Sequence, residues 1–279
     1  MQPSAKFAFF GTPSVASETL AYLLTHGYTP TIVITAPDAP RGRGLTLTPS
    51  PTNVLAQSHG LPVLSPKILD TEARNAIMTY RCEYAIVVAY GKIFPEALIE
   101  SFPKGVVNVH YSLLPKYRGA SPLETALLHG ETETGVTLQK MAKELDAGDI
   151  IAKETAPIAP HETARELRPR LVALGARLLT TTLPDYLNGK LAPSPQDPTQ
   201  ATRAYKLGKG DGQLSLEASA QENWNKYRAY ADSIGTYFFK DGQRIKITEA
   251  EYVQGIFRIL RVIPEGKREI SFADFSRHP

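Results

Sequence analysis

The opening of the chain alternates compact apolar runs with a helical pattern, and this alternation constrains the fold more than any other feature of the sequence. The run at residues 6–10 is typical of a buried parallel strand. A helix over residues 15–24 should follow, with Thr12 or Ser14 as its N-cap, and then a β-branched strand at residues 31–35. A strand-helix-strand opening of this kind predicts an α/β fold with a doubly wound, mostly parallel sheet.

A nicotinamide-dependent dehydrogenase is the first rival that such a fold suggests. Its phosphate-binding turn carries Gly-x-Gly-x-x-Gly directly after the first strand. Residues 10–13 read Phe-Gly-Thr-Pro instead, without the glycines that let a pyrophosphate approach the helix. We therefore exclude that class of enzyme.

The most apolar strand of the chain is predicted at residues 84–89, and it should lie near the centre of the sheet. Tyr90 and Gly91 leave its carboxyl end. Ligands of open α/β sheets bind at the carboxyl ends of the strands, so this turn is a candidate binding position. A plain strand-to-helix turn is the alternative for the same residues.

A second strand, within residues 105–115, carries two polar side chains. Asn108 and His110 are two residues apart, so both project from the same face of the strand. Asp146 follows downstream, with Gly148 two residues later to permit a tight turn that holds the carboxylate near the strand. An amide donor, an imidazole and a carboxylate suit the transfer of a carbonyl-level carbon to an amine. On the residues alone, a hydrogen-bonded structural histidine remains the commoner arrangement.

The wider context favours catalysis. Residues 108–115, Asn-Val-His-Tyr-Ser-Leu-Leu-Pro, resemble the Asn-x-His-x-Ser-Leu-Leu-Pro motif of the formyltransferases that use 10-formyltetrahydrofolate. Residues 145–149, Leu-Asp-Ala-Gly-Asp, resemble their downstream Asp loop. The resemblance implies that Asn108, His110 and Asp146 are the catalytic residues. The residues that it places around the folate are Tyr90, Gly91, Ser112, Leu113, Leu114 and Pro115.

A Pro/Gly-rich loop at residues 36–46 carries Arg41 and Arg43. Such a loop is commonly a mobile surface loop, but two arginines among glycines can also reach phosphates. Residues 37–51 resemble the insertion loop by which methionyl-tRNA formyltransferases engage the acceptor end of tRNA. The resemblance therefore implies that Arg41 and Arg43 contact tRNA. Thr52-Asn53 stand where the family usually has Val-Lys.

The chain is expected to contain two domains. Three prolines within residues 191–198 indicate an extended linker. We assign residues 1–190 to a formyltransferase catalytic domain, 191–203 to the linker, and 204–279 to a small C-terminal β-barrel that contacts tRNA. Short alternating strands joined by a hairpin at Asp241-Gly242 suggest the barrel.

Composition narrows the remaining classes. The single cysteine, Cys82, excludes an internal disulfide and a cysteine-built zinc site, and the spacing of the histidines offers no metal site. No apolar run approaches the roughly 20 residues of a membrane span. The net charge of +3 comes from the stretch after residue 200, where 13 basic residues face 10 acidic ones. We expect a cytoplasmic monomer without a metal or membrane partner.

The predicted activity is transfer of the formyl group of 10-formyltetrahydrofolate to the α-amine of methionine on initiator Met-tRNA. The amine attacks directly, while Asn108 and protonated His110 stabilise the oxyanion. One alternative keeps the chemistry but uses a nucleotide-linked amino sugar as acceptor, and another is a non-catalytic tRNA-binding protein on an inactive scaffold. A hydrolase with a catalytic triad of Ser112, His110 and Asp146 is the mechanistic rival. The residues around Ser112 lack the Gly-x-Ser-x-Gly elbow that would expose its hydroxyl, which disfavours this interpretation. Arg118 could pair with a folate carboxylate or with a tRNA phosphate.

Overall fold

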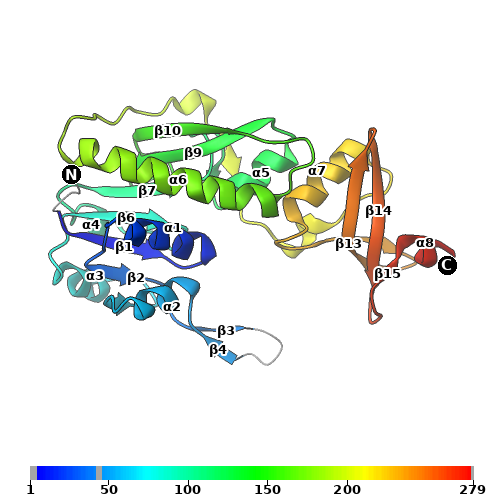
Figure 1. Cartoon of the computed structure of the whole chain (residues 1–279), viewed down its shortest axis with the longest axis horizontal. Coiled ribbons are helices and arrows are strands. Elements are labelled where there is room, and N and C mark those ends of the chain that lie inside the picture. Colours follow the sequence, from blue (N-terminus) through cyan, green and yellow to red (C-terminus); the bar gives the residue numbers. More distant parts are fainter. Residues whose placement is uncertain (1–4, 42–45, 278–279) are drawn as a thin grey trace. The chain divides into compact units, whose positions relative to one another are not determined.

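The computed structural model describes residues 5–41 and 46–277 (Figure 1). The chain forms two compact units, each assembled from separate stretches of sequence. Unit 1 comprises residues 1–118, 135–156 and 169–203, and unit 2 comprises residues 119–134, 157–168 and 204–279. The assignment of a catalytic domain, linker and tRNA-contacting domain to residues 1–190, 191–203 and 204–279 stays a prediction.

Unit 1 contains a seven-stranded sheet in the order β10-β9-β7-β6-β1-β2-β5. Its strands are β1 (Phe7–Gly11), β2 (Ile32–Ile34), β5 (Val63–Leu64), β6 (Tyr84–Val88), β7 (Val106–His110), β9 (Glu133–Lys140) and β10 (Ile150–Pro157). The pairs β5/β2, β2/β1, β1/β6 and β6/β7 are parallel, and β9 runs antiparallel to β7. The predicted mostly parallel α/β sheet is confirmed.

The central strands β1 and β6 are buried along their whole length. Their register aligns Gly11 with Val88, and Val88 in turn aligns with Val109 of β7. Because these strands are parallel, their carboxyl ends meet at one edge of the sheet. That edge brings together Gly11, the turn after Val88, and His110.

Helices of the chain follow the strands. They are α1 (Ser14–Thr25), α2 (Pro51–Ser58), α3 (Thr71–Met78), α4 (Glu96–Ile99), α5 (Pro122–Leu128), α6 (Ala164–Leu187), α7 (Ala220–Tyr230) and α8 (Phe272–Arg277). Short pieces are β8 (Arg118–Gly119), β11 (Arg203–Ala204), η1 (Pro198–Gln200) and η2 (Lys209–Gly212). Among the residues that the structure describes, none of these helices has the length and apolar character to cross a membrane.

The predicted N-cap of α1 is wrong. The cap position is Pro13, and no side chain caps the helix. Thr12 instead donates its hydroxyl to the Tyr90 carbonyl at 3.4 Å and accepts a hydrogen bond from the Ala36 backbone at 3.2 Å. Its side chain therefore ties together the segments that follow β1, β2 and β6, a tertiary use that local sequence does not reveal.

The Pro/Gly-rich loop contains a short hairpin of β3 (Ala39–Arg41) and β4 (Thr46–Thr48). Arg41 is the last residue of β3, and Arg43 lies outside the described residues. At the base of the hairpin, Asn53 donates to the Asp38 carboxylate at 3.4 Å. Thr52 donates to the Thr12 carbonyl at 3.2 Å. The departure from the usual Val-Lys thus places two short polar side chains that bind within unit 1.

Unit 2 contains a four-stranded antiparallel sheet in the order β12-β13-β14-β15. Its strands are β12 (Thr236–Lys240), β13 (Gln243–Val253), β14 (Ile256–Pro264) and β15 (Ile270–Ser271). Asp241 and Gly242 both have positive φ, 51° and 76°, which confirms the predicted hairpin turn. The sheet packs its apolar face around Trp224 of α7, and this arrangement fits a small barrel-like domain.

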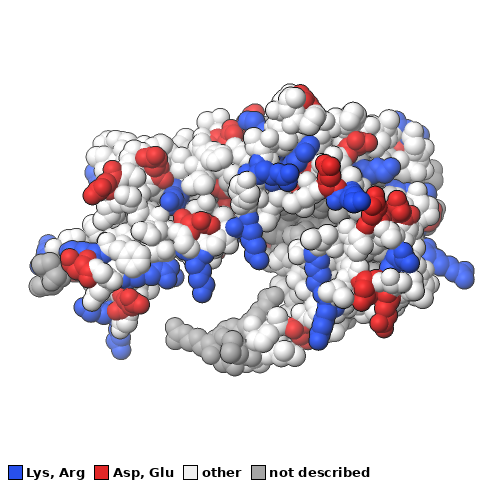
Figure 2. All heavy atoms as spheres, turned by 180° about the vertical axis from the view of Figure 1, so that it is seen from behind, with Lys and Arg blue, Asp and Glu red and all other residues white. Residues whose placement is uncertain are grey.

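Basic and acidic side chains are interspersed over the face of the molecule drawn in Figure 2. The net charge is only +3. Mixed surface charge of this kind neither demands nor excludes a nucleic acid partner, so the function has to be argued from the site.

Candidate active site

Three side chains that the sequence predicted to be catalytic converge at the carboxyl end of β7. Asn108 and His110 project from the same side of this strand, as their spacing predicts. Asp146 approaches from the loop after β9, with its Oδ1 3.4 Å from Asn108 Nδ2 and its Oδ2 3.7 Å from His110 Nδ1. The side chains of His110 and Asp146 are 6% and 10% exposed, so the pair is largely withdrawn from water. Their catalytic roles stay a prediction.

The His110 ring is held at both nitrogens. Nε2 lies 2.9 Å from the carbonyl oxygen of Tyr117, while Nδ1 faces Asp146. Tyr117 has a φ of 62°, a left-handed conformation that few non-glycine residues adopt. Both ring nitrogens therefore face oxygen atoms, but only the contact at Nε2 is short enough for a hydrogen bond.

The carboxylate of Asp146 is fixed by a residue that the sequence did not single out. Gln139 donates from Nε2 to Asp146 Oδ1 at 2.7 Å. The register of β7 and β9 places Gln139 directly opposite Asn108. Oδ1 thus accepts from two amides, and Oδ2 is the oxygen that faces the imidazole. Only the strand register could have identified Gln139, and the register of this pair was not predicted.

The Asp146 loop (residues 141–149) connects β9 and β10. Gly148 is essential to it, but the reason differs from the expected one. The positive φ belongs to Asp146 itself, at 50°, whereas a Cβ on Gly148 would lie only 1.8 Å from the Lys140 carbonyl oxygen. Glycine is required here because two backbone segments pass too close for a side chain.

Arg118 and Gln196 join the same cluster. The Arg118 guanidinium donates from Nε and Nη2 to Gln196 Oε1 at 3.0 and 2.8 Å. Gln196 lies in the proline-rich stretch, where nothing in the sequence indicated a functional residue. The sequence left open whether Arg118 pairs with a folate carboxylate or with a tRNA phosphate. In this structure it binds Gln196, a side chain of the same unit.

The segment predicted to shape the folate side is packed against β9. The Ser112 side chain is fully buried, and its Oγ donates to the Lys116 carbonyl at 2.6 Å. Thr137 donates to the Ser112 carbonyl at 2.7 Å and accepts from the Leu114 backbone at 3.1 Å. Because the Ser112 hydroxyl donates to a carbonyl and not to His110, the geometry opposes a nucleophilic triad.

Leu113 and Pro115 are half-buried, and Leu114 is fully buried. A Cβ on Gly135 would lie 2.5 Å from Leu113 Cδ2, so the leucine side chain rests directly on the backbone of β9. Residues 112–115 are therefore held rigidly against β9. Whether folate lies against it stays a prediction.

The turn after β6 offers backbone more than side chains. The Tyr90 ring packs edge-on against Phe10 at 5.4 Å and against Phe94 at 5.8 Å, and burial raises the pKa of its phenol above the ordinary value. Gly91 has a φ of 78°, and a Cβ there would meet no atom within 4 Å. The Tyr90 side chain thus belongs to the core, while the backbone at Gly91 borders open space.

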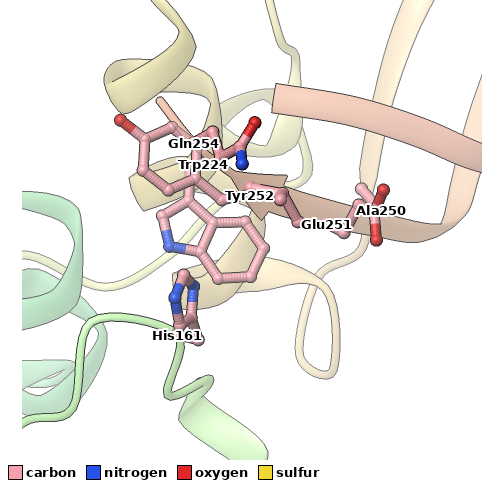
Figure 3. Close-up of a pocket in the computed structure, with 7 residues that line it drawn as sticks. His161, Trp224, Ala250, Glu251, Tyr252 and Gln254 are labelled. Atoms are coloured by element: carbon pink, nitrogen blue, oxygen red, sulfur yellow. The ribbon is translucent and has the colours of Figure 1, made fainter. Parts of the chain in front are cut away.

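A pocket of about 310 Å³ in unit 2 is drawn in Figure 3. His161, Trp224 and Tyr252 form its aromatic lining. The Trp224 ring is stacked on Tyr252 at 6.0 Å, and its Nε1 donates to the Pro160 carbonyl at 3.1 Å. The ring is thus committed to the core of unit 2. Within residues 5–41 and 46–277, no group of three or more His, Cys, Asp or Glu side chains is placed to hold a metal ion.

Comparison with known proteins agrees with the fold and with the motifs. A family model described as formyl transferase matches residues 5–183. This match covers more than half of the chain, so the chain belongs to the formyl transferase family.

Curated relatives define the branch of the family. The methionyl-tRNA formyltransferase of Bdellovibrio bacteriovorus is 38% identical, with 97% of this chain and 94% of the relative covered. That of Synechococcus sp. (strain JA-2-3B'a(2-13)) is 42% identical, with 88% and 77% covered. Within the formyl transferases, the chain therefore falls among the methionyl-tRNA formyltransferases, as its motifs indicated.

Solved structures agree on the fold. A methionyl-tRNA formyltransferase from Clostridium thermocellum matches with a TM-score of 0.65 at 15% identity, covering 96% of this chain and 99% of that one. A sugar 3N-formyl transferase, solved in the presence of dTDP and 5-N-formyl-THF, matches with a TM-score of 0.68 at 19% identity, covering 90% and 88%. The fold is common to enzymes with both kinds of acceptor, so it does not choose between them.

Proposed function

We propose that this chain transfers the formyl group of 10-formyltetrahydrofolate to the α-amine of methionine on initiator Met-tRNA. The observation that carries the proposal is the buried cluster of Asn108, His110 and Asp146 at the carboxyl edge of the sheet. Curated relatives named methionyl-tRNA formyltransferase, at 36–40% identity, support the acceptor. We place the reaction in the cytoplasm and expect a monomer.

Two donors of the cluster suit the formyl oxygen, which gains negative charge as the amine attacks the formyl carbon. Asn108 Nδ2 carries two hydrogens, and its contact with Asp146 uses only one. His110 Nδ1 is 3.7 Å from Asp146 Oδ2, longer than an ordinary hydrogen bond, so an N–H at Nδ1 can donate to a substrate oxygen that lies in the plane of the ring. Loss of one such donor typically costs about 2.7–4 kcal/mol of barrier.

Asp146 suits the transfer of the proton. The new bond forms between the amine nitrogen and the formyl carbon, the bond from that carbon to N10 of the folate breaks, and one proton must move from the amine to N10. Oδ1 is held by Gln139 and Asn108, which fixes the plane of the carboxylate. Oδ2 then points toward the reacting centre, where it can accept and return this proton.

The turn at Gly91 fits the folate. It lies after β6, next to β7, and leaves space above its backbone. Ile93, two residues further along the chain, is 91% accessible and offers an apolar side chain in the same segment. A flat heteroaromatic ring can lie there with its polar edge on backbone groups, and Ser112 to Pro115 would form the opposite wall. Arg41 and Arg43 of the loop 36–46 are the residues we assign to the tRNA.

The acceptor is tested by measuring formyl transfer from 10-formyltetrahydrofolate to charged initiator Met-tRNA and, in parallel, to nucleotide-linked amino sugars. Wild-type protein should formylate the tRNA, and Asn108→Ala should lose about 100-fold or more in rate, as expected for loss of an oxyanion donor. Asn75→Ala, on the exposed side of α3, is the matched control. Transfer only to a sugar would replace the acceptor, and transfer to neither would refute the proposal.

A further inference from the structure

Gln196 joins three parts of unit 1 through four hydrogen bonds. Its Nε2 donates to the Asp146 carbonyl at 2.9 Å and to the Gly148 carbonyl at 2.7 Å. Its Oε1 accepts from Nε and Nη2 of Arg118 at 3.0 and 2.8 Å. All four distances lie in the ordinary range for hydrogen bonds. Both ends of the Gln196 amide are therefore fully engaged.

Arg118 determines which way this amide points. A guanidinium carries only donors, so it binds the amide oxygen and repels the NH₂ group. The opposite orientation would also set the amide oxygen against two carbonyl oxygens. With the oxygen on Arg118, the two hydrogens of Nε2 must face the Asp146 loop. The guanidinium thus orients Gln196 as a double donor.

The part of the Asp146 loop to which Gln196 donates hydrogen bonds has a strained backbone. Asp146 has a φ of 50°, and a non-glycine residue in such a region costs about 1–3 kcal/mol unless its surroundings hold it there. The carbonyls bound by Gln196 belong to Asp146 and Gly148, on either side of Ala147. The amide therefore spans the turn that directs the Asp146 carboxylate toward His110 and Asn108.

We propose that Gln196, oriented by Arg118, is a positioning residue that holds the Asp146 loop in its left-handed conformation for formyl transfer. This inference rests on the proposed function, because it assigns the loop a part in that reaction. Arg118 directly follows Tyr117, whose carbonyl oxygen binds His110 Nε2. Two consecutive residues thus position the two groups of the pair. Tyr117 binds the His110 imidazole directly, and Arg118 positions the Asp146 carboxylate through Gln196.

The first test is Gln196→Glu. The carboxylate keeps an acceptor for Arg118 but removes both donors to the loop. A displacement of about 1 Å at a reacting group can cost about 100-fold, so we expect kcat to fall by about 10- to 100-fold. Since neither Gln196 nor Arg118 is assigned to a substrate, KM for the folate and for the tRNA should stay within about twofold of the wild-type values. Gln57→Glu, the same change at an exposed position of α2, should behave as wild type.

The second test separates this role from direct ligand binding by Arg118. Arg118→Met leaves Gln196 and its donors in place and removes only their orientation, so it tests the inference even if Gln196→Glu does not fold. Arg118→Met should lower kcat with little change in KM. The double variant Arg118→Met/Gln196→Met should lose no more kcat than whichever of the single variants Arg118→Met and Gln196→Met has the lower kcat. Coupled residues are non-additive in this way.

Three results would overturn the inference: a kcat for Gln196→Glu equal to that of Gln57→Glu, losses that multiply in the double variant, or an Arg118→Met defect confined to KM. Failure of the wild-type protein to formylate Met-tRNA would instead remove the proposed function. The two failures are therefore distinguishable in one experiment.

Discussion

Replacement of Gly148 by alanine should disable the site while leaving the cluster's own side chains intact. The added Cβ would lie 1.8 Å from the Lys140 carbonyl oxygen, a backbone atom that cannot rotate away. Real Cβ contacts essentially never fall below 3.0 Å, so the two segments must separate by about 1.2 Å. The loop is closed at its base by the hydrogen bond from Lys140 N to Asp149 O at 2.8 Å, so the displacement will pass to Asp146, two residues away.

A shift of this size at a reacting group corresponds to about a 100-fold loss in rate. We therefore expect Gly148→Ala to lower kcat about 100-fold in a steady-state formylation assay, with a smaller change in KM. Gly210→Ala is the control, because a Cβ there would meet no atom within 4 Å. Thermal melting of both variants establishes that they are folded at the assay temperature. Activity of Gly148→Ala close to that of Gly210→Ala would show that the close approach at Gly148 does not control the position of Asp146.

Three further changes test other parts of the structure. Ser112→Ala should keep its activity, because Ser112 Oγ donates to the Lys116 carbonyl and is no nucleophile. It should lose about 0.5–1.5 kcal/mol of stability in denaturant unfolding, because the hydrogen bond of the buried Ser112 hydroxyl is removed. A collapse of activity without unfolding would restore the triad. Tyr84→Phe should leave stability at neutral pH unchanged or higher, because the buried hydroxyl has no hydrogen-bond partner. Burial raises the pKa of Tyr84, so the unfolded chain releases the phenol proton at lower pH than the folded chain does. Wild type should therefore lose stability as pH rises above about 10, and Tyr84→Phe should lose less. Equal losses of stability in unfolding curves on either side of that pH would contradict the raised pKa. Gly242→Ala, at a φ of 76°, should destabilise the hairpin of β12 and β13 by about 1 kcal/mol, measured by hydrogen exchange of their amides; unchanged protection would mean that the turn does not depend on glycine.

Local sequence was sufficient for the framework of unit 1. The apolar runs that became β1 and β6 are buried on both faces, and such strands read as continuous hydrophobic segments. Asn108 and His110 share a face because alternation along a strand is a property of the backbone. The hairpin at Asp241-Gly242 follows from turn chemistry alone. These features needed no knowledge of distant residues.

The missing parts of the site depend on long-range placement. Gln139 reaches Asp146 because β9 pairs with β7 in one register, which local sequence does not specify. Gln196 reaches the same loop from a stretch about 50 residues downstream, whose prolines indicated only a linker. Thr12 failed as a cap because its hydroxyl binds Tyr90, again a distant partner. In each case a polar side chain forms a hydrogen bond to a residue far away in the sequence, and local sequence does not reveal such a partner.

We propose that Asp146, held against His110 and Asn108, takes part in formyl transfer to Met-tRNA. The most direct test is the single-turnover rate of formylation for Asp146→Asn, with 10-formyltetrahydrofolate and charged initiator tRNA both saturating. The amide has nearly the shape of the carboxylate but lacks its charge and its ability to accept the proton of the amine. We expect a rate lower by at least about 100-fold, with the affinities for both substrates little changed. A rate within a few-fold of wild type would show that the Asp146 carboxylate has no part in the transfer.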